Sequence, residues 1–176
     1  MADEDRDDAA QWDAVEEATE LMLEGSYHEA LVKLRDVIRT DSSNPYAYHY
    51  TGVALFELGQ FEAAAAAYRA AVKLAPRYTG ARVGLSHALR ILEETRAAIT
   101  EARKALEITP GDGDALYALG LAQASGGDKR GAIRSIEAFL DSRPEFEAAQ
   151  EARAMLEKLR AGEPIDEVFD GDEDAR

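Results

Sequence analysis

The 176-residue chain contains no cysteine. This absence excludes disulfides, thiolate metal ligands and a cysteine nucleophile, and it is typical of proteins from reducing compartments. Proline is scarce, with five residues, and no apolar run approaches the ~20 residues of a membrane-spanning helix. The acidic N-terminal segment lacks the apolar stretch of a secretory signal. From these absences we expect a cytoplasmic protein without membrane insertion.

The excess negative charge lies at the two ends of the chain. The formal net charge is −15, and residues 1–24 carry ten acidic residues and one basic residue. Residues 162–176 carry seven acidic residues and one basic residue, whereas residues 25–161 contain 18 of each kind. Because blocks of like charge repel, we expect disordered acidic segments at 1–10 and 162–176. These blocks also disfavour binding to nucleic acid, because its phosphates would repel them.

A spacing of 34 residues organises the neutral middle of the chain. In one series of residues spaced by 34, each member is followed five residues later by an alanine. The prolines Pro76, Pro110 and Pro144 follow the same spacing. Self-similarity near this period is typical of stacked helical hairpins that present a surface to other proteins. We place four units at 11–44, 45–78, 79–112 and 113–146. The residues that precede these alanines by five positions are Gly25, Gly59, Glu93 and Gly127.

Each unit reads as two helices separated by a turn. In unit 45–78 the apolar residues recur at helical spacing on both sides of Gly59, which can take the left-handed conformation that ends a helix. Pro76 then helps to stop the second helix, because it has no N–H to donate. After the fourth unit, residues 147–161 form one amphipathic pattern that Gly162 and Pro164 end.

In these residues the chain resembles the tetratricopeptide repeat family. The resemblance implies an all-α fold, a right-handed α-solenoid of four repeats closed by a C-terminal capping helix, with nine helices and no strand. The third unit departs from the family pattern, and we expect a local irregularity at its turn. The departures are Arg82, Ser86, Glu93 and Thr95, and the matches of the second unit are Tyr48, Gly52, Ala64, Tyr68, Ala71 and Pro76.

The resemblance also implies where a partner binds. In this family the first helix of each unit lines a concave groove, through positions one turn apart on the face away from the second helix. The same aromatic residues at helical spacing could instead form core, and that alternative stays open. Carried over unit by unit, the groove residues are Trp12, Val15, Thr19, Tyr46, His49, Val53, Phe56, Val83, His87, Arg90, Tyr117 and Leu121.

A subclass of the family binds acidic C-termini through a clamp of lysine, arginine and asparagine side chains. We exclude that subclass, because other residue types stand at the clamp positions. They are Val15, Thr19, Tyr50, Gly80 and Gly84.

We find no catalytic motif, and we expect no enzyme activity, no cofactor and no metal site. Two of the three histidines, His49 and His87, lie on neighbouring first helices but lack a third ligand.

The expected function is a protein–protein interaction module, an adaptor or scaffold that binds an apolar or amphipathic peptide segment. Two alternatives remain: a secretion-type chaperone that holds an unfolded client, and a regulatory subunit that acts in trans on an enzyme. Homo-oligomers through the capping helix or the groove face are compatible with the pattern. So is docking of the acidic tail, with Ile165 and Phe169, onto the protein's own surface.

Overall fold

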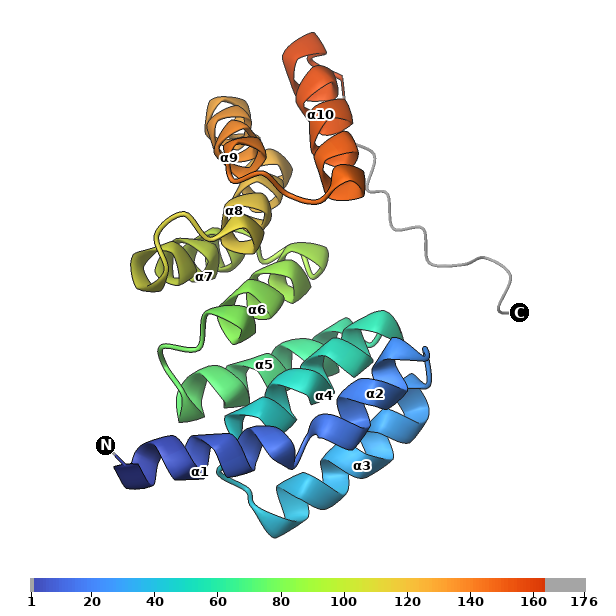
Figure 1. Cartoon of the computed structure of the whole chain (residues 1–176). Coiled ribbons are helices and arrows are strands. Elements are labelled where there is room, and N and C mark those ends of the chain that lie inside the picture. The colour runs from blue at the N-terminus through green and yellow to red at the C-terminus, as the bar shows by residue number, and fades with distance from the viewer. Residues whose placement is uncertain (1, 164–176) are drawn as a thin grey trace, which may run out of the picture.

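The computed structural model describes residues 2–163 as a curved array of helices (Figure 1). The described residues contain ten helices, one more than expected. The extra helix arises because the first helix of the first unit is split at Ala14 and Val15. No strand occurs between residues 2 and 163. The helices are α1 Ala2–Asp13, α2 Glu16–Leu23, α3 Tyr27–Thr40, α4 Pro45–Glu57, α5 Phe61–Leu74, α6 Thr79–Ile91, α7 Thr95–Ile108, α8 Gly113–Ser125, α9 Lys129–Asp141 and α10 Phe146–Ala161.

The helices pack in consecutive pairs, α2 with α3, α4 with α5, α6 with α7 and α8 with α9. The second helices begin 34 residues apart, at Tyr27, Phe61, Thr95 and Lys129. Each pair also packs on the next through its second helix, and the first helices α2, α4, α6 and α8 contact one another in turn. The first helices therefore line the inner side of the array, as the resemblance to the tetratricopeptide repeat family implies.

The turn inside each pair has one conformation in all four units. The residue at the 34-residue step has a positive φ, 76° at Gly25, 70° at Gly59, 60° at Glu93 and 76° at Gly127. Its N–H donates to the carbonyl three residues earlier, and the next N–H donates to the carbonyl five residues earlier. This pattern satisfies carbonyls that the helix end leaves free. The irregularity expected at the third turn is therefore absent, because Glu93 adopts the glycine conformation.

Replacing Glu93 with glycine is expected to stabilise the protein by about 0.5–1 kcal/mol. A residue with a Cβ pays about 1–2 kcal/mol in the left-handed conformation, and the extra backbone entropy of glycine offsets part of the gain. Urea unfolding measures the difference. Glu107→Gly is the control, because this exposed residue has ordinary helical geometry within α7, and glycine there should destabilise. If Glu93→Gly also destabilises, the strain assigned to this turn is wrong.

Two of the other departures of the third unit, Arg82 and Ser86, are buried polar groups with partners. Arg82 donates from Nε and Nη2 to the carbonyl of Pro76, at 3.0 and 2.7 Å, and from Nη1 to Oε2 of Glu101 at 2.5 Å. The hydroxyl of Ser86 donates to the carbonyl of Ala98 at 2.9 Å. Buried polar groups are tolerated when hydrogen-bonded in this way. The third unit thus keeps the family geometry with polar side chains where the family pattern has an aromatic and a small residue.

An aromatic ring from α5 joins the second and third units. Tyr68 is only 4% exposed and packs with alanines and leucines of α5, α6 and α7. A Cβ added at Gly52 of α4 would lie 2.7 Å from a ring carbon, and one at Gly84 of α6 would also clash with the ring. The two glycines therefore leave the space that Tyr68 fills between neighbouring first helices.

Residues 1–10 were expected to be disordered, but the structure places Ala2–Asp13 in α1, which packs against α4. Asn44 caps α4 by accepting from the N–H groups of Tyr46 and Ala47, and its amide donates to the carbonyl of Gln11 at 2.8 Å. The hydroxyl of Tyr46 donates to Asp8 at 2.7 Å. These contacts hold the end of α1 on α4, and the charge pattern alone gave no signal for them.

At the C-terminal end, α10 occupies the place of the expected capping helix 147–161. Of the expected acidic tail 162–176, residues 164–176 lie outside the described part of the chain.

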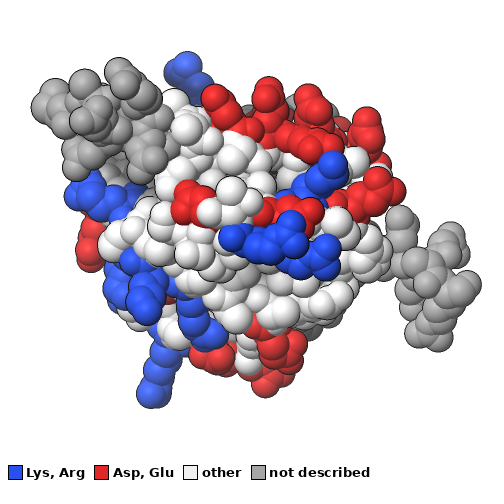
Figure 2. Space-filling model, turned by 90° about the horizontal axis from the view of Figure 1, so that it is seen from below, with Lys and Arg blue, Asp and Glu red and all other residues white. Residues whose placement is uncertain are grey.

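On the face at the bottom of Figure 1, Lys and Arg lie among Asp and Glu, with acidic side chains gathered along one edge (Figure 2). One ion pair of the first unit joins Lys33 to Glu17.

Candidate binding groove

A groove of about 1230 Å³ opens on the inner side of the array, between α6, α8 and α10. It forms because α10 packs on α9 and lies away from α8. The backbones of α10 and α8 are farther apart than those of α4 and α6, or of α6 and α8. The groove is lined by apolar side chains from four helices, with polar and charged groups between them. The residues that define it are Phe56, His87, Arg90, Tyr117, Leu121, Met155 and Lys158.

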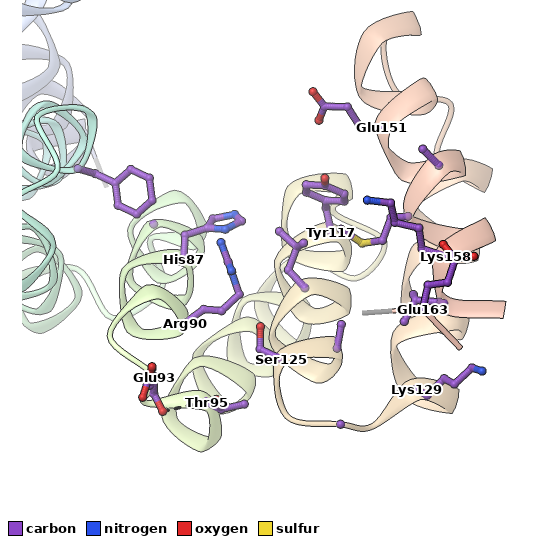
Figure 3. A pocket seen from close by; sticks show the side chains of 18 of the residues that line it. His87, Arg90, Glu93, Thr95, Tyr117, Ser125, Lys129, Glu151, Lys158 and Glu163 are labelled. Carbon is purple, nitrogen blue, oxygen red and sulfur yellow. Dashed lines mark hydrogen bonds between the residues drawn. The ribbon is translucent and has the colours of Figure 1, made fainter. Parts of the chain in front are cut away.

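The α6 side of the groove presents one imidazole and one guanidinium. His87 and Arg90 extend from α6 toward Tyr117 on α8 (Figure 3). Burial lowers the pKa of His87 to about 4, and the positive charge of Arg90 contributes to the same shift. His87 is therefore neutral at neutral pH, and Arg90 supplies the positive charge on this side.

The α8 side is aromatic and apolar. The ring of Tyr117 packs on Phe139 of α9, with 4.9 Å between the ring centroids. Burial and the charge of Glu151 raise the pKa of Tyr117. Its phenol therefore stays protonated and can donate or accept a hydrogen bond in the groove. Leu121 lies one turn further along α8 and lines the same space.

The α10 side carries charges of both signs around one flexible apolar side chain. Lys158 extends from α10 toward the groove, and Glu151 lies about two turns earlier on the same helix (Figure 3). Met155 stands between them in the sequence, and a methionine adapts readily to irregular apolar partners. The arrangement suits a partner segment with apolar side chains and some charge. Apolar side chains such as Leu121 and Met155 form the floor of the groove, and charged groups border it.

A family model described as "Tetratricopeptide repeat" matches residues 15–79 and 83–145. The chain belongs to the tetratricopeptide repeat family. The fold is that of a protein–protein interaction scaffold. No curated protein matches at the level of sequence.

Solved structures share this fold at low sequence identity. TTC0263 from Thermus thermophilus, described as a thermophilic tetratricopeptide repeat protein, matches with a TM-score of 0.73 and 20% identity, over 86% of this chain and 82% of that one. A MamA chain from Desulfovibrio magneticus RS-1 matches with a TM-score of 0.66 and 22% identity, over 82% and 92% of the two chains. At such identities the likeness shows the fold alone.

Five of the twelve groove residues predicted from the tetratricopeptide repeat pattern line this space. They are Phe56, His87, Arg90, Tyr117 and Leu121. The α10 residues were missed, although the amphipathic pattern of 147–161 signalled their helix. The pattern gives the existence of a capping helix but not the angle at which it leaves α9.

Val15 and Val83 were predicted in the groove but are buried, at 0% and 8% exposed. Val15 joins the core of the first unit because the break between α1 and α2 turns it inward, against Leu34. Val83 packs with Ala102 and Ala115, because α8 covers this position of α6. For these two residues the core alternative holds and the prediction was wrong. Val53 is partly buried against the core of the second unit.

Three other predicted residues form a separate aromatic cluster near α1. Trp12 packs edge-on against Tyr46, with 5.1 Å between ring centroids, and Tyr46 packs against Tyr78 at 5.3 Å. His49 lies 4.8 Å from the ring of Tyr78. Thr19 donates its hydroxyl hydrogen to the carbonyl of Glu16 at 2.7 Å. Trp12, Tyr46 and His49 therefore contact other aromatic rings, and none of the four residues lines the groove.

Two other features, a metal-ligand cluster and a membrane-spanning helix, are absent from the described residues. Between residues 8 and 163 no cluster of three or more His, Cys, Asp or Glu side chains could hold a metal ion. No helix within residues 2–163 combines the length and apolar character that crossing a membrane requires.

The neutral His87 is expected to make folding stability depend on pH. Its folded pKa of about 4 lies below the ordinary value of 6.5, so the unfolded chain binds more protons between these values. The stability contribution is complete above pH 6.5 and is lost as the pH falls toward 4. We expect wild type to lose about 1–2 kcal/mol more than His87→Gln between pH 7 and pH 5.

Urea unfolding at the two pH values measures this difference. His28→Gln is the matched control, because His28 is exposed on α3, and it should lose the same free energy as wild type. Equal losses for wild type and His87→Gln would show that the imidazole is not held neutral by burial.

Proposed function

We propose that this tetratricopeptide repeat protein is a non-catalytic adaptor that binds an apolar or amphipathic segment of a partner protein in the groove. The observation that carries the proposal is the open space between α6, α8 and α10, with its apolar floor. Its volume exceeds the range of about 300–1,000 Å³ that is usual for small-molecule pockets. A peptide segment fits this scale and places its apolar side chains on Leu121 and Met155.

Apolar contacts supply most of the affinity in this proposal. Burying one leucine- or phenylalanine-sized side chain contributes about 1.5–3 kcal/mol, so two or three anchors offset the ordering of a short segment. Arg90, Tyr117 and the neutral His87 supply the polar contacts that select among apolar segments. Arginine and tyrosine are residue types that often dominate binding energy at protein interfaces.

A library of displayed peptides, each about five helical turns long, tests the proposal with the full chain as bait. We expect selected peptides to carry apolar residues at helical or alternating spacing. Their affinity should fall at least tenfold for Leu121→Glu, because a carboxylate would lie on the apolar floor. Leu23→Glu makes the same chemical change at a position of α2 that is 90% exposed, and it should leave the affinity unchanged. Peptides that bind both variants equally well would contradict the groove assignment.

A further inference from the structure

Resting on the proposed function, we infer that residues 164–170 of this same chain, called the tail segment, occupy the groove in the unbound protein. A partner would then bind by displacing the tail segment. Four features support the inference: the point where the chain leaves α10, the sequence of the tail segment, the charges around its exit, and its tether.

The chain leaves α10 at the edge of the groove. Gly162 has a left-handed φ of 79°, and the N–H groups of Gly162 and Glu163 donate to the carbonyls of Leu159 and Lys158. This C-cap ends the helix and turns the chain. Both Gly162 and Glu163 line the groove, so the next residues start at its border (Figure 3).

The tail segment fits the kind of ligand proposed for the groove. Ile165, Val168 and Phe169 recur at the spacing of one helix face, and Asp166 and Glu167 lie between them. Its reach suffices, because an extended chain spans at most about 3.3–3.6 Å per residue. Ile165 is thus confined to within ~7 Å of Glu163, and Phe169 reaches about 20 Å from Glu163 in an extended chain or about 9 Å in a helix.

Two ammonium groups near the exit are opposite in sign to the carboxylates of the tail segment, and two carboxylates, of Glu151 and Glu163, lie on the same side. Lys158 lies in the groove wall, and the ammonium of Lys129 lies at the turn, 3.5 Å from the carbonyl of Arg160. The acidic groups Glu57 and Glu93 line the part of the groove formed by α4 and the α6–α7 turn. Lys129 and Lys158 can therefore pair with Asp166 and Glu167 of the tail segment, while its apolar side chains reach the floor.

The covalent tether makes weak contacts sufficient. A short flexible connection gives an effective concentration in the millimolar range, so a segment with an affinity near ~0.1 mM in free form would occupy the groove most of the time. A partner in solution would then bind roughly tenfold more weakly than to the empty groove. The tail segment would therefore admit only partners whose affinity for the empty groove is high enough to offset this loss.

The methionine methyl groups report on this directly in the full chain. Met155 lines the groove, whereas Met22 lies on α2 in the first unit. With ¹³C-methyl methionine, we expect Ile165→Ser with Phe169→Ser to shift the Met155 signal and to leave Met22 unchanged. Gly171→Ser with Ala175→Ser adds the same two hydroxyl groups further along and should leave both signals at their wild-type positions.

A synthetic peptide of residues 163–170 gives the second measurement. It should bind the Ile165→Ser, Phe169→Ser variant roughly tenfold more tightly than wild type, whose groove is occupied. Identical Met155 signals in wild type and this variant, with equal peptide affinities, would overturn the inference. A Met155 difference that disappears on dilution would also overturn it, because a second copy would then be the occupant.

Failure of this inference differs from failure of the proposed function. If library peptides bind in a Leu121-dependent way while the Met155 signals coincide, only the tail segment is excluded. If no library peptide binds even the Ile165→Ser, Phe169→Ser variant, the groove itself is not a peptide site.

Discussion

Replacing Tyr68 with alanine is expected to lower the free energy of unfolding by about 3–5 kcal/mol, the cost of deleting a large buried aromatic side chain. The ring is 4% exposed and fills the space that Gly52 and Gly84 leave on two neighbouring first helices. Its loss would leave a cavity between the second and third units. Because stability in a repeat array depends on interfaces between neighbours, such a loss would uncouple the two halves of the array.

Guanidinium unfolding followed by circular dichroism measures the effect. Tyr68→Phe is the matched control, because it keeps the ring between the glycines, and it should cost less than about 1.5 kcal/mol. A cost below about 1.5 kcal/mol for Tyr68→Ala would contradict the packing of this ring between the two units.

Replacing Glu101 with alanine is expected to cost about 3 kcal/mol. The side chains of the Arg82–Glu101 pair are only 11% and 14% exposed, and removing one partner leaves a buried charge without its counter-ion. The cost stays at the lower end of the usual range of about 3–5 kcal/mol, because Arg82 keeps its bonds to the carbonyl of Pro76.

The double change Arg82→Met with Glu101→Met separates the charge effect from the packing effect. It should recover most of the stability lost in Glu101→Ala, because apolar residues of similar size avoid the desolvation cost. Thermal or urea unfolding compares the three proteins. If the double variant is less stable than Glu101→Ala, the pair contributes more through its hydrogen bonds than through charge compensation.

The repeat period predicted the helices of the internal units closely, because the turn and its hydrogen bonds repeat at the same step. Glu93 shows why residue identity alone misled at one turn. The backbone conformation is imposed by the helices on both sides, so a non-glycine residue is forced into it. The sequence shows the missing glycine, and only the structure shows that the turn persists.

The groove was predictable on one side and not on the other. His87, Arg90, Tyr117 and Leu121 follow from the periodic positions of α6 and α8. The contribution of α10 depends on its angle to α9, which long-range packing determines and no local pattern encodes.

The errors at the N-terminal end have a different cause. Periodicity assumes one continuous first helix in the first unit, but the break at Ala14 and Val15 changes the face that Val15 presents. Contacts across 30 or more residues, such as Asn44 with Gln11, then fix α1 against α4. Such contacts are invisible to patterns read within one helix.

The location of a bound peptide can be measured by photo-crosslinking. A peptide selected on the full chain, with a benzophenone in place of its central apolar residue, is irradiated in the complex, and the adducts are mapped by mass spectrometry. We expect adducts on Met155, Tyr117 or Leu121, and their loss in Leu121→Glu. Adducts on Met22, on Trp12 or on the exposed residues Leu74 of α5 and Glu107 of α7, which do not line the groove, would contradict binding there.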